Sequence, residues 1–156
     1  MRPNPPERHT GCRFRDGSFD VSVEPETSRS DQPKESSMQY VDGFVVPVPR
    51  KKLQAYRRIA QKAGRIWREH GALAYRECVA EDVKVGKLTS FPRSVKRKPG
   101  ETVVFSWIVF KSRAHRDAVN AKVMADPRLA NMMDPSAMPF DGKRMIYGGF
   151  TTLVDL

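Results

Sequence analysis

The sequence has few metal-binding and disulfide-forming side chains: two cysteines, Cys12 and Cys78, and three histidines in 156 residues. Two cysteines cannot build a disulfide framework or a four-ligand zinc site, and the scattered histidines do not make up for that shortage. This composition predicts a cytoplasmic protein with reduced thiols, no metal held by protein ligands and no cofactor.

Long apolar runs are also missing. No stretch approaches the roughly 18 apolar residues that span a membrane, and mean hydropathy is -0.57. The first twenty residues lack the apolar core of a secretory signal. The chain contains no glycine-rich phosphate loop and no nucleophile elbow, which argues against the nucleotide-hydrolase and serine-hydrolase classes that these motifs mark.

Positive charge is abundant but uneven. The net charge is +10, and residues 1–37, with 6 Lys/Arg and 7 Asp/Glu, carry none of that excess. This segment also holds 5 of the 12 prolines and few apolar side chains. Such a composition cannot bury enough apolar area to offset the entropy lost on ordering. We therefore predict a disordered extension over 1–37 and one folded domain over 38–156.

Hydrophobic periodicity over 38–156 alternates between strand and helix patterns. The longest β-branched and aromatic run, TVVFSWIVF, is typical of a central strand. Residues 81–100 have no period and are expected to form a basic loop. The patterns predict strands at 40–48, 72–80, 102–110 and 143–154, and helices at 50–70 and 113–125.

This order of elements predicts an α+β fold. Two β-α-β units give the ferredoxin-like βαββαβ arrangement, a four-stranded antiparallel sheet with two helices on one face. In the central run, Phe105 and Trp107 point to one face and Val104 and Ile108 to the other, so both faces are apolar. Because helices cover only one of them, a second copy of the chain is expected on the other, giving a homodimer.

Four blocks of the sequence resemble the DUF1428 family of small bacterial proteins. They are YVDGFVVPVP, IWREHGALAYREC, FPRSVKRKPGETVVFSWIVFKSRAHRDAVNAKVMADPR and MPFDGKRMIYGGFTTLVDL, which together span most of 38–156. The resemblance implies a dimeric α/β-barrel, in which two ferredoxin-like protomers bring their sheets face to face. It implies no particular reaction, because the wider superfamily includes oxygenases, haem-degrading enzymes, dismutases and binding proteins.

Three side chains are candidates for acid–base chemistry: Asp42, Glu77 and His115. Carboxylates are uncommon inside strands, so Asp42 and Glu77 stand out. If the side of its strand that carries Glu77 is buried, that carboxylate is either ion-paired, with Lys143 or Arg144 as partner, or a group of raised pKa in a cleft. His115 lies early in the second helix and is either chemically active or a solvated position.

A small-molecule pocket is the first functional hypothesis, at the sheet–helix or the dimer interface. Aromatic side chains with polar tips could line it, although such residues are more often core. Lys143 and Arg144 either hold an anionic ligand at the mouth of this pocket or belong to an ordinary turn. The residues leave open whether the protein is an enzyme. The expected lining residues are Trp107, Tyr75, Tyr147, Lys143 and Arg144, with Ser106 and Phe150.

Polyanion binding is the second hypothesis. A chain this basic attracts anionic partners through its summed field, and one loop gathers Arg93, Lys96, Arg97 and Lys98. The aromatic–basic signature of RNA-recognition folds is missing. We therefore expect weak, non-specific nucleic-acid binding and rank this hypothesis below the pocket.

Overall fold

The structure is a computed structural model that describes residues 38–132, 134 and 136–156. The predicted disordered extension over 1–37 lies outside the described residues.

Four strands form one sheet: β1 (Tyr40–Pro49), β2 (Ala74–Val79), β3 (Glu101–Phe110) and β4 (Ile146–Thr151). Their order across the sheet is β2-β3-β1-β4, and each neighbouring pair is antiparallel. The predicted α+β class and antiparallel sheet are confirmed, and β3 is an inner strand as its composition indicated. The last strand is shorter than 143–154, because the chain turns through a 3-10 helix, η2 (Gly142–Arg144), before it extends.

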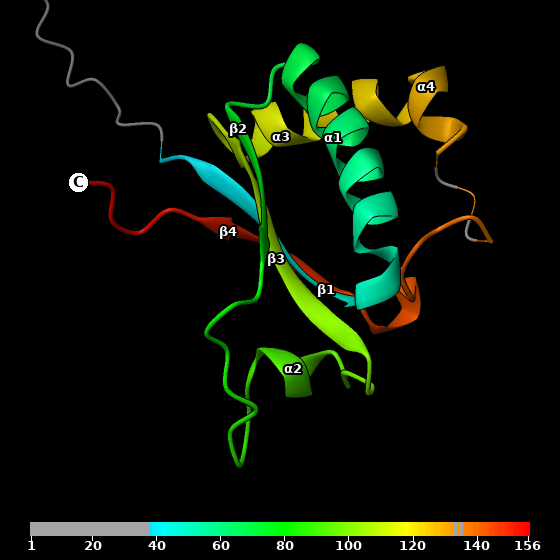
Figure 1. The fold of residues 1–156 in the computed structure, drawn as a ribbon. Helices are drawn as coiled ribbons and strands as arrows, with labels where there is room; N and C mark the ends of the chain where they lie inside the picture. The colour runs from blue at the N-terminus through cyan, green and yellow to red at the C-terminus, as the bar shows by residue number, and fades with distance from the viewer. Residues whose placement is uncertain (1–37, 133, 135) are drawn as a thin grey trace, which may run out of the picture. The chain divides into compact units, whose positions relative to one another are not determined.

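The helices gather mainly on one side of this sheet, where Figure 1 shows α1, α3 and α4 together. The 3-10 helix η1 leads directly into α1, so the predicted helix over 50–70 is nearly right. Besides η2, the described residues form five helical elements. They are η1 (Arg50–Lys52), α1 (Leu53–Glu69), α2 (Phe91–Ser94), α3 (Arg113–Met124) and α4 (Pro127–Ala130).

Local signals set the helix ends. Gly71 follows α1 with φ of 116°, a left-handed conformation that glycine adopts without steric cost. The Ser112 side chain caps α3 by accepting from the His115 backbone N–H at 3.1 Å. The Asp126 side chain caps α4 in the same way, and Pro127 occupies the first turn.

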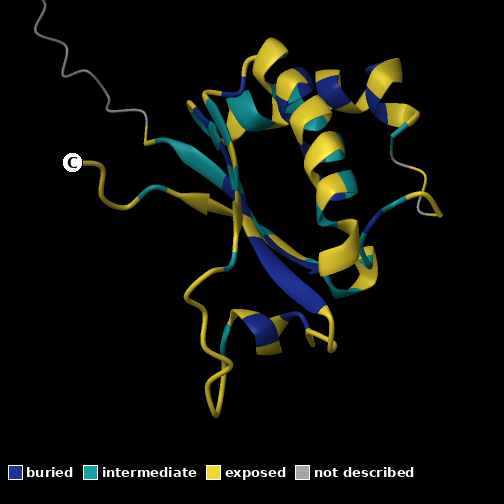
Figure 2. Ribbon diagram, in the orientation of Figure 1, coloured by how far each residue is buried: buried dark blue, intermediate teal, exposed yellow. Residues whose placement is uncertain are grey.

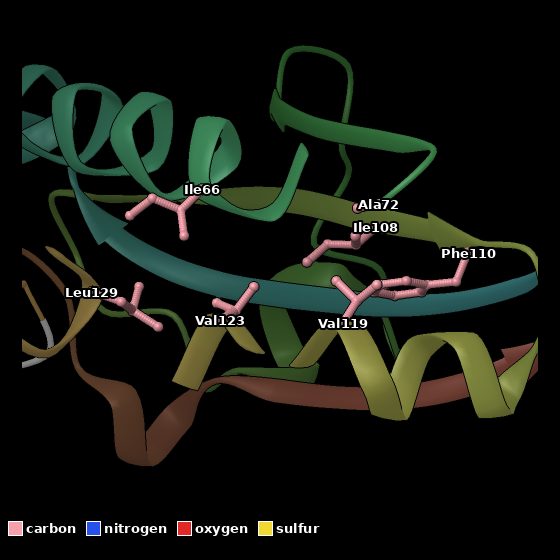
Figure 3. Packing of buried hydrophobic residues seen from close by; sticks show 7 residues of the cluster. All are labelled: Ile66, Ala72, Ile108, Phe110, Val119, Val123 and Leu129. Carbon is pink, nitrogen blue, oxygen red and sulfur yellow. The ribbon is translucent and has the colours of Figure 1, made fainter. Parts of the chain in front are cut away.

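The largest core cluster lies between the helices and the sheet, as Figure 3 shows. Ile108 and Phe110 of β3 pack there against Val119 and Val123 of α3. The outward faces of the helices are exposed, so burial follows the sheet-facing stripe of each helix (Figure 2). This packing holds α1 over β2 and β3, where the candidate site lies.

The segment between β2 and β3 is more structured than the loop expected over 81–100. It contains the short helix α2, which begins at the Ser90 cap with a proline in its first turn. Val95, only 1% exposed, packs on Val45 and Val103 of the sheet. These two side chains point away from the α1 side, so this segment covers part of the other face. The expectation of a loop rested on the many basic residues of this segment. It overlooked Val95, whose apolar side chain anchors the segment to the sheet.

None of the described helices is long and apolar enough to cross a membrane.

Candidate functional site

The site begins with three side chains that lie next to one another across the sheet. Glu77 of β2 is paired in register with Ser106 of β3, which is paired with Phe44 of β1. Side chains paired in register share a face. Ser106 alternates with Phe105 and Trp107, so it points to the helix side and they point to the other. Glu77 therefore faces α1, so the side of the strand that carries it is the inner one.

Two tyrosines hold the Glu77 carboxylate. The Tyr56 hydroxyl, from α1, donates to Oε2 at 2.8 Å, and the Tyr75 hydroxyl, from β2 itself, donates to Oε1 at 2.8 Å. The Ser106 side chain is a further hydrogen-bonding neighbour. The predicted ion pair with Lys143 or Arg144 is therefore wrong: neutral hydroxyl donors occupy both carboxylate oxygens.

Burial dominates the acid–base properties of this group. It raises the pKa of Glu77 above its ordinary value, and the hydrogen bonds from Tyr75, Tyr56 and Ser106 oppose that rise without cancelling it. Burial and the adjacent carboxylate also raise the pKa of Tyr56 and of Tyr75 well above the ordinary value of 10. Both tyrosines therefore stay protonated at neutral pH and keep donating. This matches the predicted alternative of a carboxyl with a raised pKa in a cleft.

Gly64 allows this geometry. A Cβ added at Gly64 would lie 2.7 Å from a ring carbon of Tyr75, closer than real contacts allow. The missing side chain lets α1 approach β2 until the Tyr75 ring lies directly against the helix. The Trp67 ring, which lies about one turn further along α1, packs against the Tyr75 ring with its centroid 6.2 Å away. The orientation of the Tyr75 hydroxyl thus depends on a glycine inside a helix.

Glu77 opens onto a cavity of about 450 Å³ between the sheet, α1 and α3. The walls are mostly apolar and include Phe44, Trp67, Ile108 and Phe140. Flexible thioethers make up a further part of the lining, from Met124, Met132, Met138 and Met145. Methionine side chains adapt to the shape of what they contact. The size and composition are those of small-molecule sites in proteins.

A second polar group lines the same cavity. The buried Asp42 carboxylate accepts from Arg116 Nε at 3.0 Å, and Asn120 accepts from the Trp67 indole N–H, also at 3.0 Å. The Arg116 guanidinium lies over the Tyr40 ring, 5.2 Å from its centroid. Asp42 is therefore held as the anion of an ion pair, and the Glu77 carboxyl is the acid in this cavity that lacks a basic partner.

The structure separates the aromatic residues that we expected to share one pocket. Tyr75, Tyr147 and Ser106 line the cavity, and Tyr147 stacks on Phe44 with centroids 6.2 Å apart. Trp107 and Phe150 lie on the opposite face of the sheet. There Trp107 contacts Phe105, with ring centroids 5.3 Å apart. Alternation along each strand separates them, because the register between strands decides which side chains become neighbours.

His115 and the two basic residues before β4 are placed elsewhere. His115 Nδ1 accepts from the Lys111 backbone N–H at 3.2 Å, and His115 does not line the cavity beside Glu77. Arg144 donates to Glu101 at 2.6 Å and to Asp141 at 2.8 Å, so it belongs to a buried ion pair rather than to a pocket mouth. Lys143 is exposed in η2. These positions favour the structural interpretation of all three residues.

The basic segment over 93–98 uses part of its donor capacity internally. Arg93 donates to the Val85 and Gly86 carbonyls, and Arg97 donates to the Glu101 carbonyl at 3.0 Å. Lys96 and Lys98 are exposed. Among the residues described, no group of three or more His, Cys, Asp or Glu side chains is arranged to hold a metal ion.

Sequence reasoning missed three contributors to the cavity: Tyr56, Arg116 and Asn120. Tyr56 was visible as a member of the apolar stripe of the first helix. A tyrosine on a buried stripe needs a hydrogen-bond partner for its hydroxyl, and an interior carboxylate was the available acceptor. The sequence carried no comparable signal for Arg116 or Asn120.

Comparisons with known proteins agree on the relatives of this chain. It is 53% identical over 118 residues to "Uncharacterized protein YbaA" of Escherichia coli K12, with 76% of this chain and 99% of that protein covered. The YbaA proteins of Escherichia coli O157:H7 and Shigella flexneri match equally. A solved structure, the de novo designed protein Foldit4, shares 11% identity, with 75% of this chain and 99% of that one covered. Its TM-score of 0.37 is too low to support a conclusion on the fold.

The family model described as "Protein of unknown function (DUF1428)" matches residues 39–142, which include Glu77, both of its tyrosine donors and Ser106. Most of the described residues lie within this match, and the YbaA proteins are 53% identical to the chain over 118 residues. The chain belongs to the DUF1428 family.

Proposed function

We propose that this protein binds a small, largely apolar molecule with one hydrogen-bonding group in the cavity beside Glu77. The observation that carries the proposal is the Glu77 carboxylate, held by the Tyr56 and Tyr75 hydroxyls and open to an apolar cavity of about 450 Å³. A carboxylate in such a place costs stability by its desolvation, and strongly perturbed carboxyl groups that border a cavity are typical of functional sites.

The chemistry of Glu77 suits exchange of a proton with the ligand. Burial raises the pKa of Glu77 above its ordinary value, so this carboxyl group takes up a proton more readily than an exposed one does. Tyr56 and Tyr75 stabilise the ionised form by donating to it. A ligand hydroxyl lying against Glu77 would donate to the carboxylate, and its apolar body would lie against the methionine and aromatic walls. We propose in addition that Glu77 catalyses a reaction of the bound ligand by transferring this proton.

A thermal-shift screen tests the proposal directly. The probes are phenols and cycloalkanols, each with a matched hydrocarbon that lacks the hydroxyl. Binding to the native state at about 100 times Kd stabilises it by about 2.7 kcal/mol, which a melting curve resolves. Glu77→Gln should abolish the shift given by a hit, and Glu81→Gln, an exposed acid of β2's following loop, should preserve it. A hit unaffected by Glu77→Gln would refute the assignment of this residue.

We also propose that the fold is ferredoxin-like and that a second copy covers the free face of the sheet. The βαββαβ order with strands arranged β2-β3-β1-β4 supports the first part. The second part is supported by large apolar side chains that α2 leaves uncovered. Phe105 is 42% exposed and Phe150 is 61% exposed, on the same face as Trp107 and Ile146. Joined sheets would form the dimeric α/β-barrel that the family resemblance implies.

Two matched substitutions on β4 test the dimer. Phe150 and Tyr147 are both exposed aromatics, at 61% and 74%, but they point to opposite faces. Phe150→Glu should convert the dimer to a folded monomer in sedimentation equilibrium, since it places a charge inside the joined faces. Tyr147→Glu should leave the mass unchanged. A wild-type protein that is monomeric at micromolar concentration would overturn the barrel.

A further inference from the structure

A second cavity lies along the edge of the sheet. It has a volume of about 660 Å³ and runs between α1 and the edge strand β2. Tyr56, Tyr75 and Glu77 line both cavities, so these residues form a partition between them. The cavity beside α3 has apolar walls, whereas this groove is bordered by guanidinium groups.

Four arginines line the groove: Arg57, Arg65 and Arg68 from α1, and Arg76 from the edge strand β2, where its side chain starts on the face opposite Glu77. All four are exposed, and none takes part in the ion pairs found among the described residues. Of the described residues that line the groove, Glu77 alone is acidic, and its two oxygens already accept from tyrosines. The groove therefore carries a clear excess of positive charge without internal compensation.

Two of these arginines are held in position by the backbone. Arg68 donates to the carbonyls of Ala72 and Leu73, and Arg76 donates to the Tyr75 carbonyl at 3.0 Å. Their other guanidinium N–H groups have no acceptor among the hydrogen bonds found. Within the described part of the chain, no hydrogen bond is found for the side chains of Arg57 and Arg65. The donors around the groove are consequently available to an added anion.

The floor of the groove is apolar. Leu53 and Ala60 of α1 face Val79 and Val104 of the sheet, with the tyrosine rings between them. An anionic group at the rim and an apolar body on the floor would satisfy both parts of this surface. A flat polyanion, such as a nucleic-acid backbone, would contact the rim but leave the floor empty.

We propose that this groove binds a small organic anion, a carboxylate or phosphate monoester attached to an apolar ring or chain. Arginine binds both anions by paired, charge-assisted hydrogen bonds. The proposal does not rest on the function assigned to the first cavity, because anion binding here requires no ligand there. A molecule held in this way would bring its apolar part to the far side of Glu77.

Isothermal titration of the full chain with phenyl phosphate tests the proposal. Inorganic phosphate and benzyl alcohol serve as probes of the anion alone and of the ring alone. Phenyl phosphate should bind more tightly than either, because it engages rim and floor together. The double variant Arg57→Gln/Arg65→Gln should weaken binding by roughly tenfold or more, the size expected from losing charged hydrogen bonds.

The matched control changes the same charge on the outer side of the same helix. Arg58 and Lys62 are exposed and line neither cavity, so Arg58→Gln/Lys62→Gln should alter the affinity less than about threefold through the general field. Equal losses in the two double variants would show attraction by overall charge and would overturn the site. If a short RNA binds more tightly than phenyl phosphate and competes with it, the natural ligand of the groove is a polyanion and the small-anion proposal is wrong. Both double variants should keep the wild-type melting temperature and should still be stabilised by ligands of the cavity beside Glu77. A failure of the anion site can therefore be distinguished from a failure of the proposed function.

Discussion

Removal of one hydroxyl from the Glu77 site is the sharpest perturbation that the structure offers. Tyr75→Phe and Tyr56→Phe each delete a donor at 2.8 Å from a carboxylate oxygen and leave the packed ring in place. Hydrogen bonds to a charged group contribute about 1.5 to 3 kcal/mol. Because Glu77 borders two cavities that admit water, we expect the lower end, about 1.5 kcal/mol for each substitution. For a domain of this size, this lowers Tm by about 6 °C.

The pH dependence of that loss has a defined sign. The hydroxyls stabilise ionised Glu77, so each substitution should cost most at pH 8 and less as the pH falls toward 4 and the carboxyl takes up a proton. Since burial raises the pKa of Glu77, the loss begins to shrink above pH 4.5. A raised pKa also means that charged Glu77 lowers the stability of the folded state. Wild-type stability should therefore decrease as the pH rises through the folded pKa, and Glu77→Gln should remove that decrease.

Urea unfolding at several pH values measures these terms, and carboxyl NMR on glutamate-labelled protein follows the pKa of Glu77 itself. Each phenylalanine variant should raise that pKa further. Tyr147→Phe is the matched control, because Tyr147 lines the same cavity, is 74% exposed and should change stability very little. A Tyr75→Phe variant with wild-type stability at pH 8, or with a lower pKa for Glu77, would refute the assigned hydrogen bonding.

Three further predictions follow from other contacts. Gly64→Ala should cost about 1 to 3 kcal/mol of unfolding free energy and abolish ligand shifts, because its Cβ displaces the Tyr75 ring; Gln61→Ala, one turn away, should do neither. Arg144→Met should cost about 3 to 5 kcal/mol at pH 7, since it leaves buried Glu101 unpaired. The pKa of Glu101 is lowered by Arg144, so that stabilisation is present at neutral pH and lost as the pH falls through the lowered pKa. In urea unfolding, the difference in stability between variant and wild type should therefore shrink as the pH is lowered below 4.5. Fluorescence anisotropy should show weak RNA binding that falls steeply with salt whatever the sequence, with a flatter slope after glutamine replaces Arg93, Lys96, Arg97 and Lys98.

The residues that share one side of β2 were predictable because that grouping depends only on alternation within one strand. Glu77, Tyr75 and Val79 recur every second residue, so they share a face wherever the strand lies. The apolar stripe of α1 and its end at Gly71 follow from equally local rules. The hydrogen-bond partner of Glu77 does not follow from local rules. Tyr56 is 21 residues away on another element and contacts Glu77 only when α1 packs on the sheet. Arg144 likewise meets Glu101 across 43 residues.

Which aromatic residues share a face of the sheet was also not predictable from the sequence, even for residues on neighbouring strands. Trp107 and Tyr75 lie on adjacent strands, yet the register pairs Trp107 with Arg76 and so places Tyr75 on the other side. A shift of one residue would have reversed that result, and no local pattern specifies the shift.

The sequence by itself therefore determined the order of the elements and their α+β class through short-range periodicity, and the family through long similar blocks. It also placed Glu77 on one side of its strand with Tyr75 and Val79, but not in the interior. The tertiary structure decided what surrounds the carboxylate. Two hydroxyls, a glycine that admits a ring, a cavity with apolar walls and a groove bordered by arginines come from segments that only packing brings together. Contacts between distant segments depend on register and helix position, which are properties of the whole fold.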